Sequence, residues 1–416
     1  MASGDGLMVR VRAGANALST AQLRALTALA HRYGPSDHAQ LELTRRGNLQ
    51  LRGLAAEAVA SVQREVVQLG LAAADPDVEH RLALLVDPLS GLAAQLAELA
   101  PLAAAIEQVL CQGHAHAQAG ALPSPGLPSK FGIVLAGGDG RLGAVFADIR
   151  IVVTRERPEF ARLSLAGDAQ TAAELGECAL ALVPAVVWRL LQLRAASTAP
   201  RRVALVAEAR ALLGATVVPR AVPEVVSPEL AAIGFHSGLV DWFGFGVPFG
   251  AADAATWSAL ADIADSFGRA EVRMTSERSV IVPGVRASDR AQLSAAGQRL
   301  GLITEPNDPL LRVEACPGAP ACASALGETR SWARQLARVL HEPLSAGASL
   351  HVSGCDKGCA SSARASVTLV HAADGCRLGW AADTTGAAAS SGAPLAAVEQ
   401  QLAYWAAGYA QPRRVV

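Results

Sequence analysis

The chain has 416 residues, a formal net charge of −1 and a hydrophobic fraction of 51%. This length exceeds one ordinary core, so we expect two or three domains. The balanced charge and the high apolar content exclude a disordered chain and a nucleic-acid-coating one. No apolar run of about 18 residues predicts a membrane span, and the first residues lack a signal-peptide pattern. The cysteine count, seven, is odd and favours a reducing cytoplasm.

Two segments of the chain repeat one order of elements. The first predicts a strand and two helices, over residues 7–12, 19–33 and 57–69, with Ser19 as an N-cap. The second predicts the same order over residues 242–247, 253–267 and 288–300. Between the two helices of each repeat a further strand is expected, within residues 41–54 and 272–285, and these two segments align without gaps. Such a two-fold repeat of β and α elements predicts an α/β or α+β layered fold.

The segments between and after the repeats also alternate. Strands are expected over residues 82–86, 130–135, 149–154, 311–315, 349–353 and 366–371. Helices are expected over residues 101–112, 171–196 and 323–340. Residues 113–128 read as a loop, and residues 195–202 and 218–228 as linkers. The glycine-rich residues 136–143 predict a hairpin turn rather than a nucleotide site, because no G-x-G-x-x-G opens a helix.

Four cysteines near the C-terminus carry the strongest chemical signal. They follow the pattern C-x5-C and then C-x3-C, at Cys316, Cys322, Cys355 and Cys359. Pro317 and Pro320 prevent a regular helix in the first loop, so the backbone must wrap and direct both thiolates to one centre. Four thiolates can hold a [4Fe-4S] cluster, which passes single electrons. The alternatives are zinc, which favours tighter cysteine pairs, and unligated thiols. Three other cysteines read as packed thiols, Cys111, Cys178 and Cys376.

The cysteine spacing resembles that of the sirohaem nitrite and sulfite reductase superfamily, and the likeness covers nearly the whole chain. Residues 43–53, LTRRGNLQLRG, resemble the tetrapyrrole-binding strand T-x-R-x-x-x-Q, and residues 128–132, PSKFG, resemble the R-K-F segment. The resemblance implies an α/β (α+β), pseudo-two-fold fold. Two ferredoxin-like half-domains (1–75 and 226–300) would join against two α/β domains (76–225 and 301–416), the second carrying the cluster.

An acidic tetrapyrrole needs many cationic partners, and arginine binds carboxylates through its bidentate fork. Alternate residues on a strand share a face. We therefore expect arginines and their polar neighbours to form rows toward the ring. The candidates for ring binding are Arg10, Arg12, Arg46, Asn48, Gln50, Arg52 and Arg81. Lys130 and Lys357 are the candidate catalytic residues, and Lys357 would either meet a substrate carboxylate or offset the cluster thiolates.

Two departures decide between branches of the superfamily. Reductases keep a lysine or another polar residue at the position that Gly132 occupies, and they show C-P-N-G-C where this chain has C-D-K-G-C. The segments S-G-C-x-K-G-C and SGDGLMVRVR are similar to those of precorrin-3B synthases, the monooxygenases of aerobic cobalamin biosynthesis. That resemblance implies O2-dependent hydroxylation of precorrin-3A at C20, with closure of a γ-lactone. The alternative is a sirohaem-dependent nitrite or sulfite reductase.

The resemblance also implies the cofactors and partners. A [4Fe-4S] cluster and a mononuclear non-haem iron are expected, with sirohaem only under the reductase alternative. The iron's ligands stay unassigned, since His114 and His116 lie in a segment with no evident carboxylate. NADH would be the ultimate electron donor, through a separate reductase or ferredoxin. Neither nucleic acid nor a membrane is an expected partner.

Overall fold

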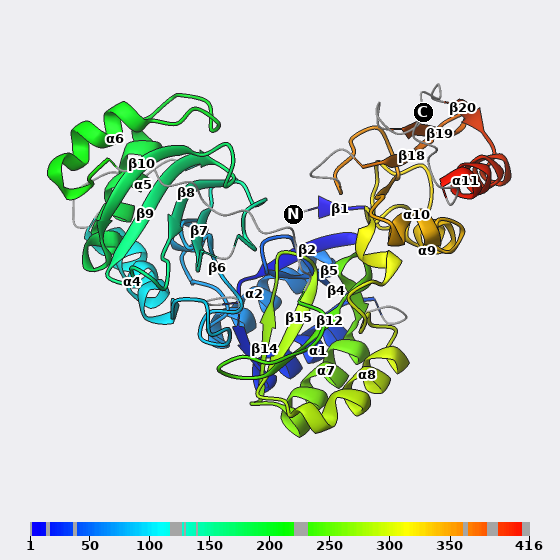
Figure 1. The fold of residues 1–416 in the computed structure, drawn as a ribbon, viewed down its shortest axis with the longest axis horizontal. Coiled ribbons are helices and arrows are strands. Elements are labelled where there is room, and N and C mark those ends of the chain that lie inside the picture. Colours follow the sequence, from blue (N-terminus) through cyan, green and yellow to red (C-terminus); the bar gives the residue numbers. More distant parts are fainter. Residues whose placement is uncertain are drawn as a thin grey trace, which may run out of the picture.

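The computed structural model describes residues 2–13, 17–35, 40–116, 127–128, 130–138, 140–219, 232–360, 365–380 and 390–409. Within these ranges the strands form four five-stranded sheets. Figure 1 shows a central module, built from both repeats, at the bottom of the molecule. One α/β unit, coloured cyan to green, lies at its upper left, and another, orange to red, at its upper right. The expected mixture of helices and sheets is confirmed.

The two repeats exchange strands. Strand β3 (Ala17–Ser19) belongs to the first repeat but pairs antiparallel with β14 (Glu271–Met274) of the second. Strand β13 (Ala251–Asp253) belongs to the second repeat but pairs with β4 (Gln40–Leu43) of the first. Because each sheet is completed by the other repeat, the two repeats form one module. Their other strands are β1 (Ala2–Ser3), β2 (Gly6–Val11), β5 (Leu49–Leu54), β11 (Gly234–His236), β12 (Trp242–Gly246) and β15 (Ser279–Pro283).

The helices of the two repeats also correspond. Helices α1 (Thr20–Tyr33) and α7 (Ala254–Phe267) pack against each other, and their apolar side chains fill a core that both sheets share. Ser19 caps α1 through a capping box, as predicted, and Asp253 caps α7. The second helix is α2 (Val59–Gln68) in the first repeat and α8 (Arg290–Arg299) in the second.

Two matching turns follow β4 and β14, at residues 44–48 and 275–279. In each, the threonine N–H donates to the carbonyl of the fifth residue, at 2.8 and 3.0 Å. In each, the threonine Oγ1 accepts two backbone N–H groups, at 3.1–3.3 Å. Both turns need a left-handed residue, which is Gly47 in the first (φ 64°) and Arg278 in the second (φ 58°). The two repeats therefore share not only the order of their elements but also the individual hydrogen bonds of this turn.

The first α/β unit contains a sheet of β6 (Leu84–Val86), β7 (Ile133–Ala136), β8 (Ala147–Val152), β9 (Phe160–Gly167) and β10 (Ala173–Ala179). Strands β6, β7 and β8 are parallel, and β9 and β10 extend the sheet in antiparallel fashion. Its helices are α3 (Pro76–Arg81), α4 (Ala100–His116), α5 (Val183–Ala196) and α6 (Val206–Leu213).

Three predictions for this unit are wrong, wholly or in part. The helix expected over 171–196 begins only at Val183, because Asp168 accepts three hydrogen bonds from Gln170 and Thr171 and closes a hairpin that makes 173–179 a strand. Residues 136–143 are not a hairpin turn, because β7 and β8 are parallel and the segment crosses between them. Residues 113–116 end α4 instead of starting a loop, and 117–126 lie outside the described residues.

The last α/β unit contains β16 (Val313–Ala315), β17 (Leu350–Ser353), β18 (Val367–Ala372), β19 (Gly375–Trp380) and β20 (Ser390–Ala393), with α9 (Arg330–Val339), α10 (His341–Ser345) and α11 (Leu395–Tyr409). The helix expected over 323–340 begins only at Arg330. The preceding residues form turns, and the Leu326 N–H donates to the Gly354 carbonyl at 2.8 Å. The four domain boundaries given above stay a proposal.

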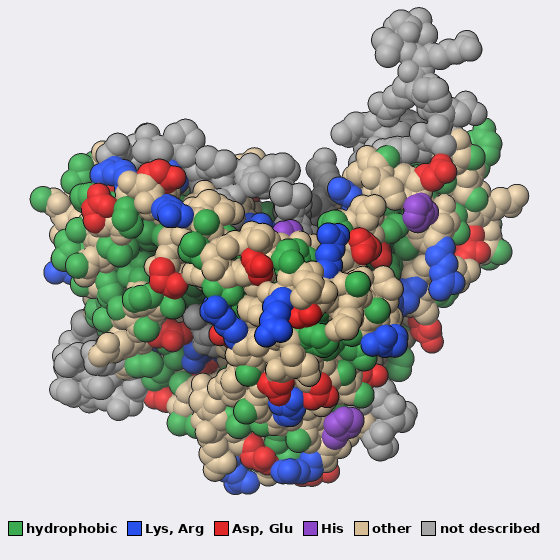
Figure 2. Space-filling model, turned by 60° about the horizontal axis from the view of Figure 1, so that its bottom comes forward, with side chains coloured by type: hydrophobic (Ala, Val, Ile, Leu, Met, Phe, Trp, Pro, Cys, Tyr) green, Lys and Arg blue, Asp and Glu red, His purple; other side chains and the backbone are tan. Residues whose placement is uncertain are grey.

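The surface carries both signs of charge. On the face that Figure 2 presents, Lys and Arg side chains are interspersed with Asp and Glu, in keeping with the net charge of −1. Among the described helices, none has the length and apolar character to cross a bilayer.

We predict that Trp257→Phe lowers the free energy of unfolding by about 1–3 kcal/mol. Trp257 is fully buried in α7, and its Nε1 donates to the Leu41 carbonyl of the other repeat at 3.0 Å. Urea denaturation measures the change. Tyr404→Phe, at a residue 86% exposed, is the control and should stay within about 0.5 kcal/mol. Equal effects of the two substitutions would contradict a structural role for this bond.

Candidate functional site

The two cysteine loops lie at the same edge of one sheet. Strands β16 and β17 are parallel and place Ala315 opposite Val352. Cys316 directly follows β16, and Cys355 follows β17 after Gly354. Because the carboxyl ends of parallel strands meet at one sheet edge, both loops begin side by side, as the wrapped-loop interpretation requires.

Hydrogen bonds tie the two loops together. The Gly354 N–H donates to the Cys316 sulfur at 3.2 Å, and the Lys357 ammonium donates to Ser324 Oγ at 2.8 Å. The Leu326–Gly354 backbone bond adds a third link. Cys316 is buried, Cys322 and Cys355 are half-buried, and Cys359 is exposed. An N–H directed at a cysteine sulfur is a feature that tunes iron–sulfur clusters, so the loop chemistry fits a cluster.

The loops do not by themselves assemble a metal site. Within the part of the chain that the structure describes, no three His, Cys, Asp or Glu side chains come together in a metal-ligating group. The four-cysteine ligand set therefore remains a proposal based on donor type and loop placement. The residues described offer no ligand set for a mononuclear iron, and the side chains of His114 and His116 lie outside them.

His351 lies beneath the second cysteine loop. It is 4% exposed, and its Nε2 has no hydrogen-bond partner among the described residues. A Cβ built on Gly358 would lie 3.8 Å from its Cε1. Burial, together with the charges of Arg45 and Arg278, holds the pKa of this imidazole below its ordinary value. His351, favoured in its neutral form, therefore lies between the second cysteine loop and the two turns that carry Arg45 and Arg278.

Arg52 does not point freely toward a ring. It is 6% exposed, forms ion pairs with Asp5 and Glu42, and donates to the Ala321 carbonyl at 2.9 Å. Ala321 lies inside the first cysteine loop, and its carbonyl also accepts the Gly4 N–H at 3.2 Å. These contacts indicate that Arg52 docks the cysteine loop on the central module and do not support a ring-binding role.

Arg12 and Arg81 are likewise engaged elsewhere. Arg12 forms ion pairs with Glu79 and Glu107, which join the central module to α3 and α4. Arg81 is 1% exposed at the end of α3. Burial lowers the pKa of Arg81, against the opposing charges of Asp77 and Asp75. The ion pairs of Arg12 give it a role in joining two parts of the fold, and the ring-binding role predicted for Arg12 and Arg81 stays a prediction.

Arg45 and Arg46 are consecutive in the first turn but contact opposite α/β units. Arg45 forms an ion pair with Glu314 of β16, the strand that leads to Cys316. Arg46 donates through Nη2 to the Phe146 carbonyl of the first α/β unit at 3.2 Å. Burial and the nearby Arg201 lower the pKa of Arg46, and Asp148 opposes them. The turn therefore lies where all three parts of the molecule meet.

The remaining predicted ring residues lie near this turn. Arg10 and Gln50 are paired on β2 and β5, so their side chains share one face of the sheet, as strand alternation predicts. Arg46 and Asn48 belong to the turn and not to the strand, because β5 begins at Leu49. Of these residues, only Gln50 and Arg52 alternate along one strand, β5. Lys130 is exposed just before β7.

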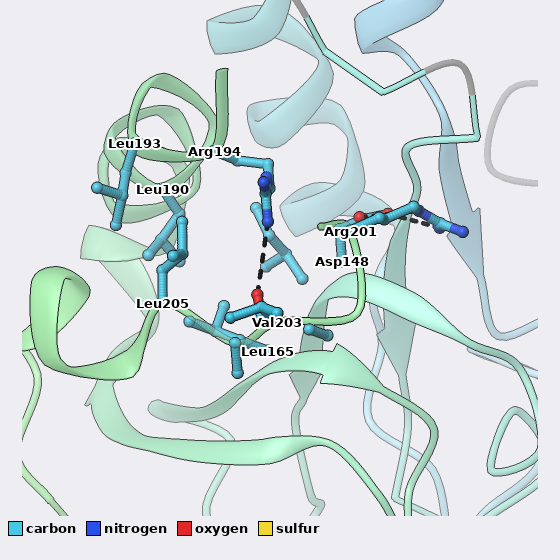
Figure 3. Close-up of a pocket in the computed structure, with 11 residues that line it drawn as sticks. Asp148, Leu165, Leu190, Leu193, Arg194, Arg201, Val203 and Leu205 are labelled. Carbon is cyan, nitrogen blue, oxygen red and sulfur yellow. Dashed lines mark hydrogen bonds and ion pairs between the residues drawn. The ribbon is translucent and has the colours of Figure 1, made fainter. Parts of the chain in front are cut away.

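Sequence reasoning missed two arginines beside Arg46. Arg201 binds Asp148 through three contacts of 2.6–3.0 Å, and Figure 3 shows the pair at the edge of a pocket lined by leucines. Arg201 and Arg202 both stack on the Phe146 ring, with Cζ at 4.5 and 5.2 Å from the ring centroid. The pocket itself, about 20 Å³, holds about one water and no ring. No local pattern marks these arginines, because they reach the site from a linker.

Arg278 was also missed, although the repeat contains a signal for it. It aligns with Gly47, a left-handed position, and keeps a left-handed φ of 58° despite its side chain. Burial, then Arg45 and Arg330, lower the pKa of Arg278 to about 10, against the opposing charge of Glu42. A left-handed position normally favours glycine. The arginine at position 278 therefore indicates that a positive charge is needed where the three parts of the molecule meet.

We predict that Cys316→Ser loses iron, sulfide and cluster absorption, because the thiolate is replaced by a weaker ligand for iron. Metal analysis of anaerobically purified protein measures this. Cys111→Ser, at an exposed cysteine outside the loops, is the matched control and should retain the cluster. A Cys316 variant with full iron and sulfide would refute the ligand assignment.

We predict that Arg52→Met lowers the free energy of unfolding by about 3–5 kcal/mol, because the half-buried Asp5 loses its ion pair and the buried Glu42 keeps only the one with Arg330. Arg24→Met is the matched control, since Arg24 forms ion pairs with Asp262 and Asp265 at the surface and should contribute about 0–1 kcal/mol. Urea unfolding of both variants measures the difference. Equal losses would argue against a docking role.

Comparisons with known proteins agree with this architecture. The family described as nitrite/sulfite reductase ferredoxin-like half domain matches residues 1–69 and 238–300. The structure of the NirA protein of Mycobacterium tuberculosis superposes with a TM-score of 0.71, at 20% identity, over 89% of this chain and 73% of that one. This likeness confirms the predicted pseudo-two-fold reductase-like fold.

Two relatives match most of the chain. A ferredoxin–nitrite reductase of Synechococcus elongatus is 27% identical, over 88% of this chain and 76% of its own length. A precorrin-3B synthase of Sinorhizobium sp is 32% identical over 382 residues, which cover 90% of this chain and 79% of that protein. The chain is therefore an oxidoreductase that belongs to the precorrin-3B synthase family, within the nitrite and sulfite reductase superfamily.

Proposed function

We propose that this protein is a precorrin-3B synthase of aerobic cobalamin biosynthesis. Precorrin-3A would be hydroxylated at C20 with one oxygen atom of O2, the other leaving as water, and a ring A acetate would close a γ-lactone. The observation that carries the proposal is the 32% identity to a precorrin-3B synthase over 90% of the chain. The arrangement of cationic side chains supports it independently.

The substrate is a polyanion, and the junction around the first turn supplies cations for it. Burial lowers the pKa of Arg46 most, and the charges of Arg201 and Arg10 lower it further against the opposing charge of Asp148, so these three arginines lie near one another. Arg202 stacks on the same Phe146 ring as Arg201. Lys130 is exposed two residues before Gly132. We assign these groups, with Gln50, to binding and orienting the ring carboxylates.

The cysteine loops would supply the electrons. A [4Fe-4S] cluster held by Cys316, Cys322, Cys355 and Cys359 would deliver electrons singly. NADH would be their ultimate source, and a separate ferredoxin or reductase would carry them, since no dinucleotide-binding fingerprint occurs in the sequence. The family implies a non-haem iron for oxygen activation, but we assign it no ligands and derive no step from it.

Arg52 and Arg45 would hold the cluster side of the site in place. Arg52 anchors the first cysteine loop through Ala321, and Arg45 anchors the strand before Cys316 through Glu314. Both anchors start from the central module, whose first turn also carries Arg46. A ring bound at that turn would therefore lie at a fixed distance from the cluster loops, which is what single-electron delivery requires.

The nitrite or sulfite reductase alternative has weaker support. Its relatives are less similar, at 27% identity for the cyanobacterial nitrite reductase. Gly132 also removes the side chain that the reductases place beside their anion. A small anion there would find an exposed Lys130 and a half-buried Arg46, but no polar side chain from position 132.

Turnover of precorrin-3A tests the proposal. The protein, purified anaerobically with its iron, is mixed with precorrin-3A, NADH and a ferredoxin–reductase pair, and then exposed to 18O2. We expect a product that carries one labelled oxygen and a lactone, detected by mass spectrometry. Cys316→Ser should give none. A wild-type protein that retains its cluster and leaves precorrin-3A unchanged, but reduces nitrite or sulfite, would refute the proposal.

A further inference from the structure

Gly132 is a glycine because of space and not because of backbone conformation. It is buried directly before β7 and lies outside the left-handed region. Its N–H donates to Asp148 Oδ2 at 2.8 Å, and its carbonyl accepts the Asp148 N–H at 2.8 Å. These bonds are available to any residue, so the backbone does not explain the choice of glycine.

The missing side chain makes room for a guanidinium from the central module. A Cβ built on Gly132 would lie 1.7 Å from Nη1 and 2.6 Å from Cζ of Arg46. Real Cβ contacts essentially never come below 3.0 Å. Any other residue at position 132 would therefore displace Arg46. Gly132 and Arg46 form a matched pair across the junction between the central module and the first α/β unit.

The pair fixes a cation that contacts no carboxylate in the part of the chain that the structure describes. Nη2 of Arg46 donates to the Phe146 carbonyl, whereas Nη1 is buried without a hydrogen-bond partner among the described residues. The nearby Asp148 already binds Arg201 and the Gly132 N–H. Arg10 and Arg201 add positive charge around Arg46. A guanidinium held in this way is suited to an anion that arrives from outside the chain.

We propose that Gly132 is a specificity-determining residue, because it seats the Arg46 guanidinium that recognises a carboxylate of the tetrapyrrole substrate. This inference rests on the proposed function for the identity of the ring. A side chain at position 132 would occupy the space that the Arg46 guanidinium now fills and would displace it. A lysine there would replace a planar, carbonyl-anchored fork with a flexible point charge, which favours a small inorganic anion over a ring carboxylate.

A double-mutant cycle tests the pairing. The ligand is uroporphyrin III, a stable octacarboxylate tetrapyrrole, and its fluorescence reports binding to the full chain and to Arg46→Ala, Gly132→Ala and the double variant. Loss of one charge-assisted contact should weaken binding about tenfold in each single variant. Because both changes remove the same seated group, the double variant should also lose about tenfold and not a hundredfold.

Stability provides a second readout that needs no ligand. Gly132→Ala should lower Tm only slightly, because the new methyl group meets the flexible end of the Arg46 side chain, which can move away, and the double variant should recover that small loss. Gly379→Ala is the matched control, since its Cβ would meet no described atom closer than 3.8 Å and its φ is not left-handed. It should leave both Tm and porphyrin affinity unchanged.

Two results would overturn the inference. One is a Gly132→Ala variant that binds the porphyrin as tightly as the wild type, and the other is a double variant whose loss is the product of the single losses. Equilibrium binding is independent of turnover. A protein that shows the coupling but does not convert precorrin-3A would therefore refute the proposed function and leave the role of Gly132 in ring recognition standing.

Discussion

Two consecutive arginines in one turn hold the three parts of this protein together. Arg45 forms an ion pair with the strand before Cys316, and Arg46 enters the seat at Gly132 and donates to Phe146. The turn is held by Thr44, whose Oγ1 accepts two backbone N–H groups. The central module therefore sets the positions of the cysteine loops and of the first α/β unit relative to each other.

The strand exchange between the repeats supports the strand that leads into this turn. Strand β4, which leads into the turn, lies between β5 and β13, and β13 comes from the second repeat. The matching turn at 275–279 carries Arg278, whose pKa is lowered first by burial and then by the charges of Arg45 and Arg330. The two-fold repeat thus directs cations from both halves to one junction, although only one turn has a glycine at its left-handed position.

Local signals in the sequence predicted much of the fold. The Ser19 cap, the helix at 253–267 and the aligned threonines depend on neighbouring residues and were right. The helix expected over 171–196 was wrong in its first part because Asp168 closes a hairpin there. A turn of this kind leaves no periodic pattern of apolar residues by which the sequence could reveal it. The parallel pairing of β7 and β8 could not be read from residues 136–143, because strand direction is decided by the whole sheet.

The candidate site shows the same division. The cysteine spacing is local, and the structure brings both loops to one sheet edge. The arginines are different, because a guanidinium's role depends on which distant carboxylate or carbonyl it meets. Arg12 and Arg52 are engaged in ion pairs, and Arg81 is buried at the end of α3, while Arg201 and Arg202 come to the junction from a linker. In the sequence, Gly132 appears only as the loss of a polar side chain. In the structure, the space beside it is filled by the guanidinium group of Arg46.

The central claim is that the tetrapyrrole is a substrate of this protein and not its prosthetic group. The absorption spectrum of the anaerobically purified protein, with iron and sulfide content measured on the same sample, tests this most directly. The account predicts a broad shoulder near the blue edge of the visible range, from the cluster alone. A strong Soret band with a red band, present in proportion to the cluster, would contradict it and identify a sirohaem reductase.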